Sequence, residues 1–199
     1  MEPFKTLNAV AVPLPSANID TDQIVPARFL QKPRSDNFGN YLFCDVRREP
    51  DGSPKTAFPL NQPAFAGSRI IVAGPNFGCG SSREHAVWAL HDGQFRAVIA
   101  PSFGDIFSSN ALKNGFLPIR LPQATVSALL ESLAQAPGTR LTVNLETQTV
   151  STASGPLADF SIDPFSRHCL LEGIDEIDYT LSLDARIQDF ERGLRPMSA

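Results

Sequence analysis

Apolar runs and glycine-rich turns alternate through the middle of the chain. Residues 70–73 (Ile-Ile-Val-Ala) and 97–100 (Ala-Val-Ile-Ala) are short apolar runs typical of buried strands. Each run is followed by apolar residues at helical spacing, within 86–90 and 103–110. Strand, helix, strand and helix in succession favour an α/β fold with a mainly parallel central sheet that helices cover on both faces.

Patterns nearer the two ends extend this prediction. Strict alternation of apolar and polar residues in 141–146 indicates additional short antiparallel strands, half exposed. Ile187, Phe190 and Leu194 share one helical face and predict a C-terminal helix at about 184–195. Further elements are expected as a strand at 10–12, a helix over 126–133, a continuation of the short strands at 150 and 160–162, and a short helix over 165–171.

Size and composition bound the class of protein. A chain of 199 residues with 42% hydrophobic and 19% charged residues suits one globular domain with a full core. The net charge of −4 gives no electrostatic reason to expect nucleic acid as a partner. No apolar run approaches membrane-spanning length, and the start of the chain lacks a signal-peptide pattern, so a cytoplasmic location is expected.

The cysteines do not form a ligand or disulfide pattern. Cys44, Cys79 and Cys169 are scattered singly, and an odd, sparse set argues against a disulfide framework. Without a Cys-x-x-Cys pair the chain alone shows no zinc or iron–sulfur spacing, and no metal ligand is predicted. Cys79 lies in a turn where it could act as a nucleophile, but a small buried cysteine is the commoner role.

The candidate chemistry lies in residues 74–85, between a predicted strand and a predicted helix. Gly78 and Gly80 let the backbone take conformations that a Cβ would forbid and let a ligand approach closely. Two hydroxyls and the Arg83 guanidinium follow, where unpaired N–H groups and the helix dipole favour an anion. The segment has neither the lysine of a Walker loop nor the third glycine of a dinucleotide fingerprint.

Helix capping is the structural alternative for the same serines. Ser81-x-x-Glu84 fits a capping box, in which the serine caps the helix and the glutamate reaches back to it. Ser102 and Asp105 form a similar cap signal before the second predicted helix. A capping role for Ser81 remains compatible with chemistry, because the N–H groups that satisfy a cap would also stabilise an anion.

Residues 76–85 (Asn-Phe-Gly-Cys-Gly-Ser-Ser-Arg-Glu-His) resemble the signature of the small, swivelling domain of the aconitase superfamily. In particular they resemble the small-subunit family of bacterial 3-isopropylmalate dehydratases. Residues 12–14 with 18–26, residues 98–107 and residues 165–173 resemble the other blocks of that family, in the same order. Because the blocks are in family order and at family spacing, the resemblance covers nearly the whole chain.

This resemblance implies a single β/β/α swivelling domain over 1–199 and a hydro-lyase activity. The reaction would isomerise 2-isopropylmalate and 3-isopropylmalate by dehydration and rehydration, in leucine biosynthesis. It implies that this chain binds no cofactor and that a 4Fe–4S cluster sits in a large subunit, without which the chain is inactive. The expected partners are that subunit, in a heterodimer or higher hetero-oligomer, and the small-molecule substrate, with neither nucleic acid nor membrane.

The family match also implies roles for individual residues. Ser81 would be the catalytic base, acting as an alkoxide that helix-start N–H groups and Arg83 stabilise. Arg83 would also bind a substrate carboxylate with its planar fork, and Ser82 would help to position the substrate. Structural support of the site would come from Gly78, Gly80, Glu84 and His85, with a structural hydrogen bond favoured over acid–base work for His85.

Residues near the start of the chain complete the predicted site. Asp22 would lie at the edge of the active site, although Asp20 and Asp22 could equally serve as turn residues. Arg28 and Leu30 would contact substrate, with a mobile loop at 30–39 and with Leu30 favouring an isopropyl group; Arg28 could instead be a solvated surface charge. No mechanistic role is assigned to His168 or Cys169, for which a structural role is the default.

Two other functions remain open at this point. A related hydro-lyase could act on homoaconitate or citraconate, and the segment around Leu30 is the only part of the sequence that separates these substrates. A non-catalytic module could have kept the anion-binding turn alone. The complete Ser-Ser-Arg set argues against the second alternative.

Overall fold

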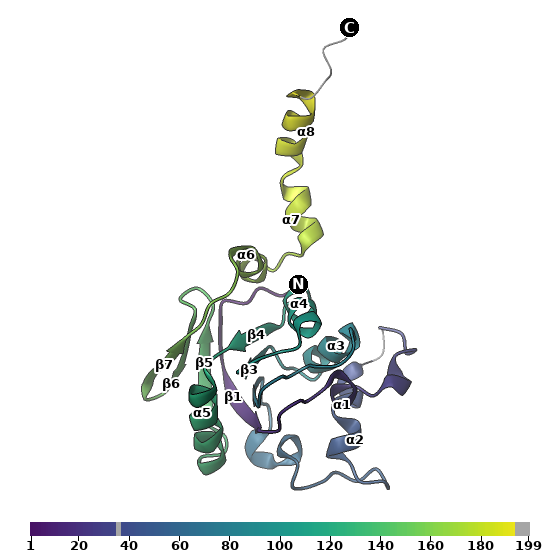
Figure 1. The fold of residues 1–199 in the computed structure, drawn as a ribbon, viewed down its shortest axis with the longest axis vertical. Coiled ribbons are helices and arrows are strands. Elements are labelled where there is room, and N and C mark those ends of the chain that lie inside the picture. The colour runs from purple at the N-terminus through teal and green to yellow at the C-terminus, as the bar shows by residue number, and fades with distance from the viewer. Residues whose placement is uncertain (35–36, 194–199) are drawn as a thin grey trace.

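Seven strands form one sheet in the computed structural model, which describes residues 1–34 and 37–193 (Figure 1). Their order in the sheet is β4-β3-β2-β1-β5-β6-β7. The strands are β1 (Thr6–Leu14), β2 (Ile70–Ala73), β3 (Ala97–Ala100), β4 (Leu117–Arg120), β5 (Arg140–Asn144), β6 (Thr149–Thr152) and β7 (Gly155–Asp159). The predicted strand around 160–162 therefore ends earlier, at Asp159.

Strand β1 joins a parallel half of the sheet to an antiparallel half. Its first half pairs antiparallel with β5, with Thr6 opposite Asn144. Its second half pairs parallel with β2, with Ala11 opposite Ile70. Strands β2, β3 and β4 continue in parallel, and β6 and β7 continue the antiparallel half. The predicted α/β fold is confirmed, with the short antiparallel strands continuing the same sheet.

Eight α-helices are seen in the described chain. They are α1 (Thr21–Ile24), α2 (Cys44–Arg47), α3 (Glu84–Asp92), α4 (Asp105–Lys113), α5 (Gln123–Gln135), α6 (Pro164–Glu172), α7 (Glu176–Ser182) and α8 (Asp184–Gly193). Helix α7 was not predicted, although Asp175 and Asp178 form a capping box at its start. Helix α8 occupies the predicted C-terminal position; residues 194 and 195, including Leu194, lie outside the described residues.

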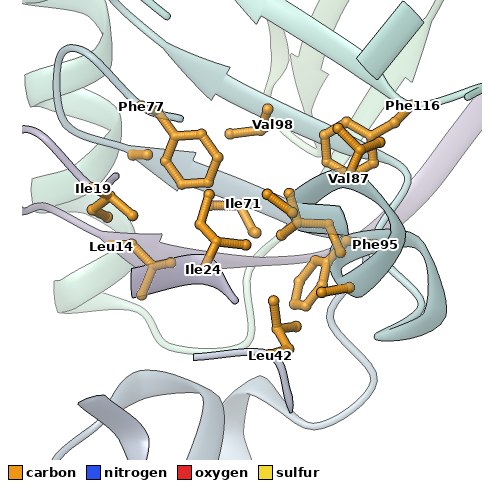
Figure 2. Packing of buried hydrophobic residues seen from close by; sticks show 14 of the residues in the cluster. Leu14, Ile19, Ile24, Leu42, Ile71, Phe77, Val87, Phe95, Val98 and Phe116 are labelled. Atoms are coloured by element: carbon orange, nitrogen blue, oxygen red, sulfur yellow. The ribbon is translucent and has the colours of Figure 1, made fainter. Parts of the chain in front are cut away.

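The core lies on both faces of the parallel strands. Ile71 and Ala73 point to the face that α3 and α4 cover, and Ile70 and Val72 point to the face that α5 covers. Figure 2 shows part of the first cluster, where Ile71 packs among residues of the loops and of α3. Burying one such side chain contributes about 1.5–3 kcal/mol. The buried residues on the two faces together therefore hold the parallel strands firmly in place.

Helices α7 and α8 extend away from the sheet (Figure 1). Their apolar side chains Ile177, Leu181 and Phe190 are 71%, 65% and 67% exposed. Among the described residues, no helix is long and apolar enough to cross a membrane.

Candidate active site at the carboxyl ends of the parallel strands

Three loops meet where strands β1, β2 and β3 end. The amide of Gly78, in the loop after β2, donates to the carbonyl of Ile19 at 2.7 Å. On the other side the amide of Phe77 donates to the carbonyl of Ser102 at 3.1 Å. The glycine-rich turn is therefore held between the loops that follow β1 and β3, at the edge where open α/β sheets bind ligands.

Gly78 has no room for a side chain. Its φ is +71°, and a Cβ built there would lie 2.2 Å from Cγ of Phe107, on α4. Gly104 is similarly close, since its Cβ would lie 2.5 Å from the carbonyl oxygen of Gly78. The predicted supporting role of Gly78 thus has a steric basis, which is direct contact between the turn and α4.

We expect Gly78→Ala to lower the free energy of unfolding by about 2 kcal/mol or more, from overpacking against Phe107 and the positive φ. Urea denaturation of both proteins measures this difference. Gly52→Ala is the matched control, because Gly52 has a φ of +85° and nothing within 4 Å of its Cβ position. Equal losses in the two variants would show that contact with Phe107 is not the reason for the glycine.

The capping-box prediction for Ser81 is wrong. Helix α3 begins at Glu84, and its N-cap residue is Arg83, which makes no side-chain cap hydrogen bond. The carbonyl of Ser81 instead accepts the amide of Arg83 at 2.8 Å. Glu84 does not reach back, because its Oε1 accepts a hydrogen bond from Nδ2 of Asn114 at 2.8 Å.

The second cap signal is also wrong, for a similar reason. Gly104 is the N-cap residue of α4 and provides no side-chain cap. The hydroxyl of Ser102 accepts the amide of Asn76 at 2.9 Å, which ties the glycine-rich turn to the loop after β3. Both serines therefore serve contacts between loops rather than the ends of helices.

Backbone amides without an acceptor follow the exposed Ser81 in the sequence. Within residues 1–34 and 37–193, the amides of Ser82, Glu84 and His85 donate to no acceptor. Two of these belong to the first turn of α3, where helical N–H groups lack intrahelical partners. The segment thus combines a hydroxyl with several N–H groups that have no partner among the described residues, and its binding of an anion stays a prediction.

Asp22 lies beside Arg83, at the edge of this turn. Its Oδ1 accepts hydrogen bonds from Nη1 of Arg83 at 2.5 Å and from the amide of Ala27 at 2.8 Å. Asp20 has the alternative role considered above, because its carboxylate caps α1 by accepting the amides of Asp22 and Gln23. The turn role is thus seen for Asp20, while a role of Asp22 at the edge of the active site stays a prediction.

Arg83 keeps most of its donors free. Its side chain is 21% exposed, and Asp22 is its ion-pair partner. In the described chain the other guanidinium nitrogens bond to no acceptor. A planar fork that is anchored at one nitrogen can still present two N–H groups to a carboxylate.

Arg28 is bound to a different partner. It lies in a 3-10 helix, η1 (Ala27–Phe29), and its guanidinium forms an ion pair with both carboxylate oxygens of Asp45. This hydrogen bonding raises the pKa of Arg28 above its ordinary value, and the charge of Asp22 adds a smaller effect in the same direction. Leu30, at the end of this 3-10 helix, is half-buried against the core. Substrate contact by Arg28 and Leu30 stays a prediction.

Parts of the predicted substrate loop are attached to α3. Arg34 makes two hydrogen bonds to the carboxylate of Asp92, at 2.8 and 2.9 Å. Phe38 is fully buried, and its ring lies 5.5 Å from the ring of His85. His85 also lies 4.5 Å from Trp88, and its ring makes no hydrogen bond to any described residue; its supporting role stays a prediction. Residues 35 and 36 lie outside the described range, and movement of the 30–39 loop stays a prediction.

The three cysteines are free. Burial, and then the charge of Asp20, raise the pKa of Cys79, which disfavours the nucleophilic thiolate at neutral pH. His168 packs its ring against Tyr179 at 5.6 Å, and Cys169 is buried, as expected of structural residues. In the part of the chain that the structure describes, no three His, Cys, Asp or Glu side chains are grouped as a metal site would require.

One residue beside the site was not predicted. The hydroxyl of Thr21 lies 3.5 Å from that of Ser81, although the two residues are 60 positions apart. The only signal in the sequence was its place between two aspartates that were themselves candidates. The pairing of its loop with the glycine-rich turn is a tertiary contact that no local pattern encodes.

Comparisons with known proteins show which family the chain resembles along its length. A family model described as the aconitase C-terminal domain matches residues 1–124, and one described as LeuD_N matches residues 127–164. The 3-isopropylmalate dehydratase small subunit of Cereibacter sphaeroides strain KD131 is 50% identical, over 98% of this chain and 96% of its own length. The protein of the same name from Roseobacter denitrificans is 48% identical, over 96% of each chain.

A solved structure supports the fold. The crystal structure of a 3-isopropylmalate dehydratase from Methanocaldococcus jannaschii matches with a TM-score of 0.64. The match covers 94% of this chain and 99% of that one, at 24% sequence identity. At this identity the likeness shows the fold, while the bacterial relatives carry the family assignment.

Proposed function

The chain belongs to the family of 3-isopropylmalate dehydratase small subunits, and we propose that it is the small-subunit half of an enzyme that interconverts 2-isopropylmalate and 3-isopropylmalate. The reaction is a dehydration followed by rehydration, a step of leucine biosynthesis. The observation that supports the proposal most is the exposed Ser81, two residues before Arg83, on a turn that two neighbouring loops hold in place. The remaining parts of the active site come from the large subunit.

Ser81 removes a proton from carbon in this proposal. An alkoxide at Ser81 takes the C–H proton of the substrate and becomes a neutral hydroxyl, and the substrate hydroxyl leaves to give the unsaturated acid. A serine hydroxyl ordinarily holds its proton too tightly for this role. The unpaired amides of Ser82, Glu84 and His85 offset that disadvantage, since one such donor in a closed site typically contributes about 3 kcal/mol.

Arg83 and Ser82 bind the substrate in the same proposal. Asp22 holds one nitrogen of Arg83, which leaves the remaining N–H groups to take a substrate carboxylate with two parallel hydrogen bonds. Ser82, exposed next to Ser81, adds a hydroxyl at the same edge. Arg28 and the apolar Leu30 contribute to choosing an isopropyl-bearing acid, and the 30–39 loop closes over it.

The large subunit supplies the metal chemistry. It would carry a 4Fe–4S cluster, which would supply Lewis-acid chemistry toward the departing hydroxyl. This chain's part is to present the base and the carboxylate-binding arginine to that centre. Because Ser81 and Ser82 are exposed here, the closed site that strengthens their interactions requires the partner's surface.

The same machinery would serve a related acid, such as homoaconitate or citraconate. In this proposal the apolar Leu30 favours an isopropyl group over a carboxylate-bearing chain, whereas acids that differ only by a methylene group are separated by about 1–3 kcal/mol. A binding module without catalysis is disfavoured, because anion binding alone needs neither a second serine nor an arginine that an aspartate orients.

Mixing the two subunits tests this proposal. We expect the pure small chain to show no turnover and the anaerobic mixture with a cluster-loaded large subunit to show it, with a joint peak in size-exclusion chromatography. The large subunit alone is the control and should be inactive. Turnover by the metal-free small chain, or two separate peaks at micromolar concentrations, would contradict the proposal.

A further inference from the structure

Thr21 is a buried polar residue placed against the active-site turn. It is 2% exposed, whereas Asp20 and Asp22 on either side of it are more accessible. Its amide donates to the carbonyl of Cys79 at 2.9 Å, and Asp20 forms a parallel bridge with Cys79. Backbone hydrogen bonds therefore fix the position of Thr21 relative to the glycine-rich turn.

The Thr21 hydroxyl has Ser81 as its polar partner. Its Oγ1 lies 3.3 Å from the Ser81 carbonyl oxygen and 3.5 Å from Ser81 Oγ. No other described residue hydrogen-bonds this hydroxyl. Since a buried hydroxyl without a partner costs about 1–3 kcal/mol, the contact with Ser81 is the one that makes a threonine acceptable here.

From this contact we propose that Thr21 is a positioning residue for Ser81, which orients its side chain and donates a hydrogen bond to its alkoxide. The inference rests on the proposed role of Ser81 as the base. It adds Thr21, the first residue of α1, to the immediate surroundings of Ser81 in the loop after β2.

The hydroxyl serves both protonation states of Ser81. When Ser81 is neutral, its O–H donates to Thr21 Oγ1, and Thr21 donates to the Ser81 carbonyl. When Ser81 is an alkoxide, its oxygen is the stronger acceptor, and the Thr21 O–H rotates to it. Thr21 keeps its proton throughout, so only a hydroxyl rotation is required. Hydrogen bonds to ionised oxygens are short, and we expect the 3.5 Å separation to close when the partner covers the site.

The test compares Thr21→Val with Thr21→Ser in the assembled enzyme. Valine keeps the shape and removes the hydroxyl, and we expect kcat to fall about 10- to 100-fold, the usual range for a hydrogen bond to a charged group. KM and the affinity for the large subunit should stay unchanged. Thr21→Ser keeps the hydroxyl and should retain a kcat within about threefold of the unmodified enzyme, because it lacks only the methyl group.

Two further variants keep the outcome decisive. If Thr21→Val does not fold, Thr21→Ala and Thr21→Ser form an equivalent pair that differs by the hydroxyl alone. Combining Thr21→Val with Ser81→Ala should cost no more than Ser81→Ala alone, because residues that act as a unit are not additive. A kcat of Thr21→Val within about twofold of normal, or an equal loss in Thr21→Ser, would overturn the role of Thr21. Full activity of Ser81→Ala would instead overturn the proposed function.

Discussion

The Ser81→Ala variant, assembled with its large subunit, is expected to lose about 1,000-fold in kcat, within the range that a positioned general base contributes. The substitution removes one oxygen from an exposed position, so the fold and the assembly with the partner should be unaffected. The loss should appear in kcat far more than in KM, because the alkoxide acts on the reacting C–H bond. Steady-state rates at saturating substrate, with the cluster content of the partner matched, measure it.

Ser127→Ala is the control for this variant. Ser127 lies on α5, on the opposite face of the sheet from α3, and is joined to Gln123 by a 3.1 Å hydrogen bond. The same chemical change there should leave kcat within about twofold of the unmodified enzyme. If Ser81→Ala also retained a normal rate, Ser81 would not be the base.

We expect Arg83→Lys to lower kcat/KM by about 100-fold, chiefly through KM, because a lysine is not equivalent to arginine at a bidentate site. Arg83 gives one nitrogen to Asp22 and has others left for a carboxylate. A lysine has a single nitrogen, which the Asp22 carboxylate would compete for. The charge is retained, so the change isolates the geometry of the fork.

Arg69→Lys is the corresponding control. Arg69 lies immediately before β2, at the opposite end of the parallel strands, and donates a long hydrogen bond of 3.4 Å to the carbonyl of Gln94. Its replacement should leave kcat/KM unchanged. An Arg83→Lys enzyme with normal kcat/KM would show that the fork does not bind the substrate carboxylate.

Periodicity predicted the elements that frame the site. The apolar runs at 70–73 and 97–100 are β2 and β3. A run of four apolar residues between turn signals is too short for a typical helix, so a buried strand was the favoured structure. The helix stop at Asn114 and Gly115 follows from Gly115, whose φ is +74°. These features depend on residues close together in sequence, which is why the pattern alone was enough.

The start of α3, at Glu84, could not be predicted in the same way. Ser81 and Glu84 have the spacing of a capping box, but the side chain of each contacts a residue far away in the chain instead. The Ser81 hydroxyl lies 3.5 Å from the hydroxyl of Thr21, and Asn114 donates a hydrogen bond to the Glu84 carboxylate. Such long-range contacts outweigh a local cap that contributes only about 1 kcal/mol.

In the candidate site too, residues could be predicted from the sequence, but the contacts between distant residues could not. Asp22 and Arg83 were predicted separately, from the family resemblance, and the structure joins them in an ion pair. Thr21 was not predicted, because its significance lies in its contact with Ser81, across 60 residues. Arg28 was predicted to contact substrate, but the structure pairs it with Asp45. This ion pair is likewise a tertiary contact that the sequence does not reveal.

The most direct test of the central claim is an anaerobic assay of this chain, reconstituted with its cluster-loaded large subunit, on three separate acids. The ultraviolet absorbance of the unsaturated acid is followed: it rises as 2-isopropylmalate or citrate is dehydrated and falls as homoaconitate, which is itself unsaturated, is hydrated. The account predicts turnover of 2-isopropylmalate, with a kcat/KM at least about 100-fold above those of the other two acids. Preferred turnover of citrate or homoaconitate, or no turnover of any acid by a complex with an intact cluster, would contradict it.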